Sequence, residues 1–235
     1  MARKPALDPR RVREEIAAVA AKLIAEDGFD FASAKRKAAR QLLGDSRISG
    51  EWLPDNDMIE DEVREYQSLF LSDSQPAILH AMRRIALEWM ARLSAFDPYV
   101  TGAVWNGTAG AHSDIHLQLF SDASKDIAIF MLNAGIDYDA GETRHAGGKG
   151  MVETLSFVVR DAALRDARAG DTDGRHGLGG MGAPADGTVG IQLSLYPQND
   201  LRGATRNDPR GRPIRGSMRM LTDMLEAQAD AQEGA

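Results

Sequence analysis

Residues 100–120 read VTGAVWNGTAGAHSDIHLQLF, and the rest of the fold can be worked out from this stretch. Residues 99–105 are rich in β-branched and aromatic side chains, which favour a strand. Residues 106–110 read NGTAG, a composition that tolerates the positive φ angles of a tight turn. Residues 115–120 then alternate apolar and polar side chains with the period of two that a half-buried strand requires. The stretch therefore predicts a strand, a glycine-rich loop and a second strand.

Polar side chains share one face of the second predicted strand. Successive side chains of a strand point to opposite faces, so Asp114, His116 and Gln118 lie together. The opposite face carries the apolar residues Ile115, Leu117 and Leu119. Two polar groups two residues apart on one strand face can hold a divalent metal ion. Because Asp114 leads this face and Ser113 precedes it, we expect a candidate site to begin at Asp114.

This stretch resembles the signature of the DNA polymerase β-like nucleotidyltransferase superfamily. That signature is Gly-Ser, a short loop that often holds another glycine, and then Ser-Asp-hydrophobic-Asp-hydrophobic. The matching positions, without a gap, are Gly102, Gly107, Ser113, Asp114 and Leu117. The resemblance covers residues 100–120 directly and residues 98–197 loosely. The whole chain resembles a proteobacterial group of proteins that carry such a domain.

Two positions depart from the signature. Ala103 stands where the superfamily has serine, and His116 stands where it has the second metal carboxylate. Imidazole is a poor ligand for magnesium, which prefers hard oxygen ligands, but it suits manganese, zinc or iron. These departures affect metal-dependent catalysis and phosphate binding differently, because binding of phosphate by backbone N–H groups does not depend on the lost side chains.

The resemblance implies transfer of a nucleotide from a nucleoside triphosphate to an unidentified RNA or protein acceptor, with Mg²⁺ or Mn²⁺ as cofactor. It assigns catalysis to Asp114 and His116. The residues it assigns to nucleotide binding are Gly102, Ala103, Asn106, Gly107 and Ser113. The positions it assigns to the metal are Asp114, His116 and Gln192, and Glu153 is a further candidate ligand from the residues alone.

The third metal ligand is the least determined of these assignments. The resembled superfamily takes it from a neighbouring strand, and the matching position on residues 189–196 is the neutral Gln192. Glu153, on a predicted strand at residues 151–159, could substitute for it in space. The alternative is that Glu153 lies at the solvent-exposed entrance of its strand.

Composition limits the class of protein. The chain has 235 residues, 43% hydrophobic and 27% charged, with a formal net charge of −7 and no cysteine. No apolar run approaches 18 residues, so we expect no membrane partner. The charged N-terminus lacks the apolar core of a secretory signal. Together with the absence of cysteine, this favours a cytoplasmic protein.

Four helices are predicted before the motif, at residues 9–27, 31–43, 57–72 and 76–96, from apolar residues spaced three and four apart. The first two, with basic residues on the second, resemble the opening of a helix-turn-helix repressor. No recognition helix follows, so DNA is the least favoured partner. The alternatives are a helical hairpin packed on the main domain and a basic face that holds an RNA or nucleotide phosphate.

The remaining elements complete an α+β chain. A helix is predicted at residues 123–133, a short strand at 136–138, a turn at 141–149, and strands at 151–159 and 189–196. Residues 161–188 lack periodicity and are predicted as a mobile surface loop. Residues 201–215 are arginine-rich and irregular, and a helix at 218–228 precedes a disordered tail.

The predicted fold is a nucleotidyltransferase-like mixed β-sheet with helices packed on one face, preceded by a helical N-terminal extension. The predicted division is a helical extension at 1–73, an α/β core at 74–200, and an arginine-rich segment, helix and tail at 201–235. The five arginines of that segment could neutralise a triphosphate or an RNA backbone, although a solvated loop is favoured: Arg202, Arg206, Arg210, Arg212 and Arg215.

Three functions remain for comparison. The first is a divergent nucleotidyltransferase with an incomplete carboxylate set. The second is a catalytically degenerate module that binds a nucleotide, RNA or protein. The third is a DNA-binding regulator that uses residues 9–43.

Overall fold

The fold is described by a computed structural model that covers residues 8–44, 49–145, 147–169, 186–203, 207–208 and 210–233. Most of the predicted loop at 161–188, the end of the C-terminal tail and Arg206 lie outside the described residues. Within the described ranges, no helix has both the length and the apolar character needed to cross a membrane.

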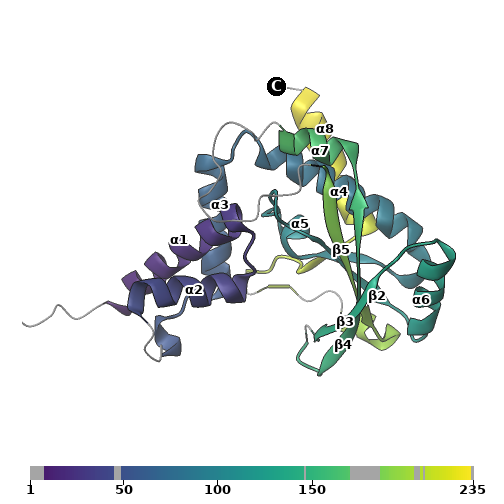
Figure 1. Cartoon of the computed structure of the whole chain (residues 1–235), viewed down its shortest axis with the longest axis horizontal. Helices are drawn as coiled ribbons and strands as arrows, with labels where there is room; N and C mark the ends of the chain where they lie inside the picture. Colours follow the sequence, from purple (N-terminus) through teal and green to yellow (C-terminus); the bar gives the residue numbers. More distant parts are fainter. Residues whose placement is uncertain are drawn as a thin grey trace, which may run out of the picture.

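Three N-terminal helices form a unit with its own hydrophobic core. They are α1 (Pro9–Asp27), α2 (Phe31–Leu43) and α3 (Asn56–Phe70), and a 3-10 turn η1 (Gly50–Trp52) precedes α3. An aspartate side chain accepts backbone N–H groups at the start of each α-helix, at Asp8, Asp30 and Asp55. The buried apolar residues of this unit pack together and not on the sheet. Figure 1 shows the unit to one side of the sheet.

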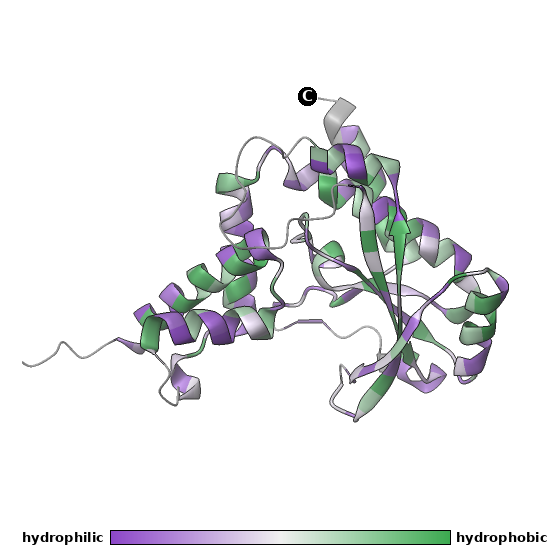
Figure 2. Cartoon of the chain, viewed as in Figure 1, coloured by the Kyte–Doolittle hydropathy of each residue, from purple (hydrophilic) through white to green (hydrophobic). Residues whose placement is uncertain are grey.

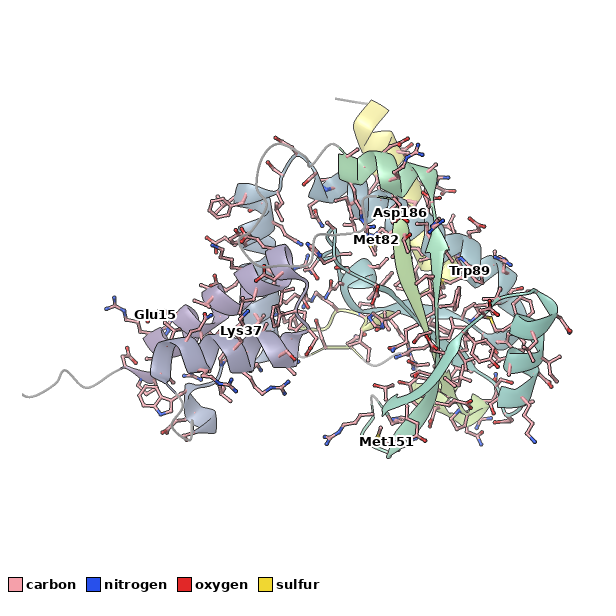
Figure 3. The ribbon with its side chains drawn as sticks, viewed as in Figure 1. Glu15, Lys37, Met82, Trp89, Met151 and Asp186 are labelled. Atoms are coloured by element: carbon pink, nitrogen blue, oxygen red, sulfur yellow. The ribbon has the colours of Figure 1, made fainter. Side chains whose placement is uncertain are left out.

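The rest of the chain is built on a six-stranded mixed sheet. Its strands are β1 (Tyr99–Thr101), β2 (Ile115–Phe120), β3 (Asp139–Arg144), β4 (Met151–Arg160), β5 (Thr188–Tyr196) and β6 (Arg215–Ser217). Their order is β3-β4-β5-β2-β1-β6, with β2 and β5 parallel and the other pairs antiparallel. Met151, which begins β4, and Asp186, just before β5, lie at opposite ends of the sheet (Figure 3).

Helices cover one face of this sheet. They are α4 (Gln75–Arg92), α6 (Ser124–Asn133), α7 (Ala162–Ala169) and α8 (Met218–Glu233). Met82 and Trp89 of α4 lie in the core between these helices and the strands. Figure 2 shows β4 and β5 largely in the hydrophobic colour, while α1 and α2 alternate between the two colours. The predicted α+β class, with a mixed sheet and a helical N-terminal extension, is confirmed.

The other face of the sheet carries a row of polar side chains. Register pairs Arg215 with Thr101, Thr101 with His116, His116 with Gln192, Gln192 with Ser156, and Ser156 with Asp139. These six residues therefore lie side by side across all six strands, on the face away from the helices. The predicted alternation in residues 115–120 is confirmed, because its apolar members are buried in the core against the helices.

The predicted strand at residues 99–105 is wrong in its second half. The strand ends at Thr101, and a short helix, α5 (Gly102–Asn106), follows. Gly102 has a φ of 69°, a left-handed conformation that breaks the strand. The helix then buries Val104 and Trp105 against the core. Tertiary burial of these two side chains outweighs their local preference for a strand.

Further boundaries differ from the predictions. The predicted strand at 136–138 is wrong, because β3 begins at Asp139, where pairing with β4 starts. The helix predicted at 76–96 ends at Arg92. Residues 141–144 belong to β3 and not to a turn, because they pair with β4. The first part of the predicted loop at 161–188 is α7, which buries Leu164 in the core. Residues 215–217 pair with β1 as an edge strand. The last helix continues to Glu233, beyond the predicted end at residue 228. A 3-10 turn η2 (Ser94–Phe96) also follows α4, and η3 (Gln198–Gly203) follows β5.

Candidate functional site

Asp114 lies at the end of the sheet, immediately before β2. Its neighbour on β5 is Gly190, since Ile115 pairs with Ile191 in register. A Cβ atom built on Gly190 would lie only 2.5 Å from Oδ1 of Asp114 and 2.9 Å from its Cγ. The missing side chain at Gly190 therefore provides the space in which the Asp114 carboxylate sits.

His116 and Gln192 form a hydrogen-bonded pair beside Asp114. They are register partners on the parallel strands β2 and β5, and His116 Nδ1 lies 3.1 Å from Gln192 Oε1. An amide oxygen can only accept, so Nδ1 is the donor of this hydrogen bond, and in the neutral ring this is the tautomer with its lone pair on Nε2. Gly102 lies against the other side of the ring, where an added Cβ would be 3.6 Å from His116 Cδ2. The structure thus brings three predicted metal ligands together: Asp114, His116 and Gln192.

These residues line a cavity of about 550 Å³. This volume is in the range of small-molecule sites. Ser113 lines the same cavity, and its Oγ accepts the backbone N–H of Gly110 at 3.0 Å. The wall also carries six polar residues outside the predicted site set: Asp27, His112, Asp139, Ser156, Arg168 and Thr188.

The N-terminal unit contributes one wall of this cavity. Asp27 ends α1, and Gly28 follows it in the left-handed conformation, with a φ of 70°. A Cβ on Gly28 would lie 2.6 Å from Cβ of His112, so the turn packs closely on the loop that precedes Asp114. The prediction of a helical extension did not anticipate that the turn after its first helix would reach the motif.

Among the described residues that line the cavity, Arg168 is the one with a Lys or Arg side chain. It lies on α7 with only 6% of its surface exposed, and its Nη1 donates to the carbonyl oxygen of Thr188 at 2.7 Å. Burial lowers the pKa of Arg168 from its ordinary value, and the negative charges of Asp186 and Asp114 oppose that shift. An arginine remains charged under such a shift, so Arg168 places a buried cation in the field of Asp114.

The glycine-rich loop at residues 106–110, predicted to bind phosphate, is held mainly by hydrogen bonds to α3, α4 and α5. The carbonyl of Ala103 accepts the backbone N–H groups of Gly107, Thr108 and Ala109. The Asn106 side chain accepts from Thr108 and donates to Glu60 of α3 at 3.1 Å. The carbonyl of Gly107 accepts from Gln75 of α4. Of the five predicted nucleotide-binding residues, only Ser113 lines the cavity that contains Asp114.

Glu153 is not brought to this group. Register places Ser156 beside Gln192, so Glu153, three residues away on β4, lies on the opposite face of the sheet. It is exposed at the start of its strand and pairs in register with Glu142 of β3. The structure therefore agrees with the alternative in which Glu153 occupies a solvent-exposed strand entrance.

The donor set of the cavity does not fit a magnesium ion. Asp27 and Asp139 also line the cavity, but Asp27 comes from the turn after α1 and Asp139 from the edge strand β3, separated from Gln192 by Ser156. The His116 and Gln192 side chains already bind each other. Magnesium requires near-octahedral oxygen coordination. Among the described residues, no group of three or more His, Asp or Glu side chains is arranged to hold a metal. The guanidinium of Arg168 adds a positive charge where a divalent cation would bind.

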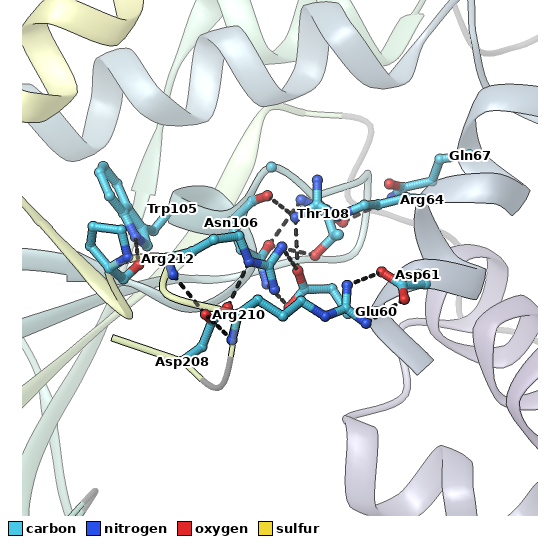
Figure 4. Close-up of polar contacts among 12 residues, drawn as sticks. Glu60, Asp61, Arg64, Gln67, Trp105, Asn106, Thr108, Asp208, Arg210 and Arg212 are labelled. Carbon is cyan, nitrogen blue, oxygen red and sulfur yellow. Dashed lines mark hydrogen bonds and ion pairs between the residues drawn. The ribbon is translucent and has the colours of Figure 1, made fainter. Parts of the chain in front are cut away.

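A second cluster joins the N-terminal unit to the core (Figure 4). Glu60 of α3 accepts Arg64 at 2.8 Å, Arg212 at 2.9 Å and Asn106 at 3.1 Å. Asp61 accepts both terminal nitrogens of Arg210, at 2.6 and 2.5 Å. The cluster borders a second cavity of about 410 Å³ between α3, α5 and residues 208–214.

The arginine-rich segment is therefore not a solvated loop at Arg210, Arg212 and Arg215, whereas Arg202 is exposed. Arg210 and Arg212 bind the acids of α3, and Arg212 also binds Asp208 at 2.6 Å. Arg215 donates to Gln118 at 2.6 Å and lies over the ring of Phe120, 4.8 Å from its centroid. These contacts correct the prediction, because the partners come from α3 and β2, far away in the sequence.

Comparison with known proteins adds no assignment. Family models, curated proteins and solved structures all contain no match to this chain.

Proposed function

We propose that this protein is a divergent member of the nucleotidyltransferase superfamily that binds a nucleoside triphosphate and lacks magnesium-dependent transfer. The observation that carries the proposal is the single cavity that gathers Ser113, Asp114, His116 and Gln192. The signature spacing in residues 100–120 supports nucleotide binding. The replacement of two expected carboxylates by a hydrogen-bonded His116–Gln192 pair supports the loss of magnesium chemistry.

The residues of the cavity can serve a nucleotide in different ways. The Ser113 hydroxyl can donate to a phosphate oxygen, since its Oγ is only an acceptor for Gly110. The lone pair on His116 Nε2 can accept a hydrogen bond from a ribose hydroxyl or a base. Gln192 fixes the tautomer that makes this acceptor available.

A second candidate function is transfer that depends on manganese. It is favoured by one observation, the protonation of His116 Nδ1 toward Gln192, because a histidine that ligates a metal typically donates its other ring nitrogen in this way. Asp114 and His116 would then hold the ion, with the nucleotide phosphates completing its shell.

Calorimetric titration with each common nucleoside triphosphate tests the proposed function. We expect wild-type protein to bind at least one triphosphate in the presence of a chelator, and binding to be little changed by Mg²⁺. Ser156→Tyr places a large side chain in the cavity and should abolish binding. Ser68→Tyr, at an exposed position on α3, is the matched control and should bind as wild type.

The outcomes separate the candidates. Absence of binding to every triphosphate at millimolar concentration would overturn the proposed function. Binding that requires Mn²⁺, together with incorporation of a labelled nucleotide into RNA or protein, would favour the second candidate.

A further inference from the structure

One buried cation stands out in the cavity. Arg168 is 6% exposed, and α7 carries it to the wall that also contains Asp114. A buried charge is costly unless it is paired and hydrogen-bonded. The carbonyl of Thr188 satisfies part of this requirement at 2.7 Å, and the negative charges of Asp186 and, to a smaller extent, Asp114 compensate the positive charge.

The geometry of β5 fixes both partners of this arrangement. Thr188 begins β5 and holds the guanidinium, while Gly190, two residues later on the same face, makes room for the Asp114 carboxylate. The cation and the carboxylate are thus positioned by one strand, at the end of the sheet where the cavity opens.

We infer that Arg168 supplies, beside Asp114, the positive charge that a divalent cation supplies in the resembled superfamily, so that the cavity takes a nucleoside triphosphate without metal. This inference rests on the proposed function and names how the phosphates are neutralised. A guanidinium is permanently charged and presents its N–H groups in a fork that matches phosphate oxygens. A metal at Asp114 would be repelled by the same charge.

Among the described residues that line the cavity, no other Lys or Arg is present to take this role. Within the described part of the chain, the arginines nearest in sequence to the last strand are held by acids or amides of other elements, such as Arg210 by Asp61 and Arg212 by Glu60. Arg212 and Glu60 line the second cavity, and none of these four residues lines the one that contains Asp114.

The first test measures nucleotide binding in the presence of a chelator. We expect Arg168→Gln to weaken binding of the triphosphate that wild type prefers by about tenfold or more, since charge-assisted hydrogen bonds are lost. Arg168→Lys keeps the charge and should retain part of the affinity. The matched control is Arg160→Gln, which removes an exposed charge from the end of β4, outside the cavity. Equal affinities for wild type and Arg168→Gln would overturn the inference.

Asp114→Asn distinguishes a site that binds the phosphates through Arg168 from one that binds them through a metal ion. If Arg168 neutralises the phosphates, the removal of a competing carboxylate should raise metal-free affinity by about threefold. If a metal is required, the same substitution should abolish binding, and the inference fails.

A second readout does not need nucleotide. Mn²⁺ binding followed by electron paramagnetic resonance should increase about tenfold in Arg168→Gln, because the repelling charge is gone. The increase should disappear when Asp114→Asn is added. If no triphosphate binds to wild type, the proposed function fails, and this titration still decides whether Arg168 acts on Asp114. An unchanged Mn²⁺ affinity would overturn that coupling. Thermal melts of each variant, with Arg168→Lys as the variant that conserves charge, show that a loss of binding is not a loss of folding.

Discussion

Replacement of Gly190 by alanine should displace the Asp114 carboxylate, and the size of the effect follows from the geometry. Gly190 does not have a left-handed φ, so its backbone accepts alanine. The new Cβ would lie 2.5 Å from Oδ1 of Asp114, whereas ordinary van der Waals contact begins at 3.4 Å. The carboxylate oxygen must therefore retreat by about 0.9 Å. Such overpacking, relieved in part by side-chain rotation, costs about 1–2 kcal/mol of unfolding free energy.

A double-mutant cycle isolates this contact. In an Asp114→Ala background the obstacle is absent, and Gly190→Ala should then be neutral or stabilising by about 0.5–1 kcal/mol, because alanine restricts the unfolded chain. Gly190→Ala should thus lower the unfolding free energy in the wild-type background and leave it unchanged or raise it in the Asp114→Ala background. The measurement is urea unfolding followed by circular dichroism for all four proteins. A destabilisation by Gly190→Ala that is the same in both backgrounds would refute the placement of Asp114 over Gly190.

Three further predictions concern the junction between the helical unit and the core. Gly28→Ala should destabilise the protein more than Gly135→Ala does, by about 1–3 kcal/mol in thermal melts. Both glycines have a φ near 70°, but only a side chain at Gly28 would clash with a neighbour. Equal effects would contradict the packing of the turn after α1 on the motif loop. Glu60→Gln should lower the unfolding free energy measured in urea by about 2 kcal/mol, because the Glu60 side chain is 14% exposed and accepts three donors. Asp61→Asn should lower it by about 0.2–1 kcal/mol, because the Asp61 side chain is 50% exposed. A larger loss for Asp61→Asn would contradict this interpretation of the cluster. Hydrogen bonds from Arg210 lower the pKa of Asp61, so the stability gained from Asp61 is present above its unfolded pKa of about 4 and is lost as pH falls through the folded pKa. Unfolding curves of wild type and Asp61→Asn should therefore converge in acid, and a gap that widens there would reverse the assigned sign.

The spacing of apolar residues correctly predicted the elements that bury one continuous apolar face. The helices α1 and α2 have the predicted bounds, and the alternation in β2 placed His116 on the face away from the helices. The sequence resemblance also selected Gln192, and register confirms that it lies beside His116. These successes depend on local patterns of apolar spacing, and such patterns are visible without any tertiary information.

Local patterns were insufficient where a neighbour in space decides the conformation. Residues 103–105 prefer a strand but form a helix, because Gly102 turns the chain and the core buries Trp105. Residues 162–169 read AALRDARA, with one large apolar side chain, and the sequence therefore gave no helical stripe. Their stability comes from Leu164 in the core and from the bond between Arg168 and Thr188.

The distribution of basic residues shows why the density of arginines in the sequence does not by itself locate a basic surface. A cluster of arginines in sequence predicts a basic surface only if no acids face it. Here Arg210 and Arg212 meet Asp61 and Glu60 of α3, so their charges serve to attach the helical unit. Of the described side chains on the cavity wall, Arg168 is the one Lys or Arg, and Asp114 lines the same cavity. The cation that we propose for an anionic ligand is consequently a single buried arginine, selected by its position on the cavity wall beside β5 and not by the local density of positive charge.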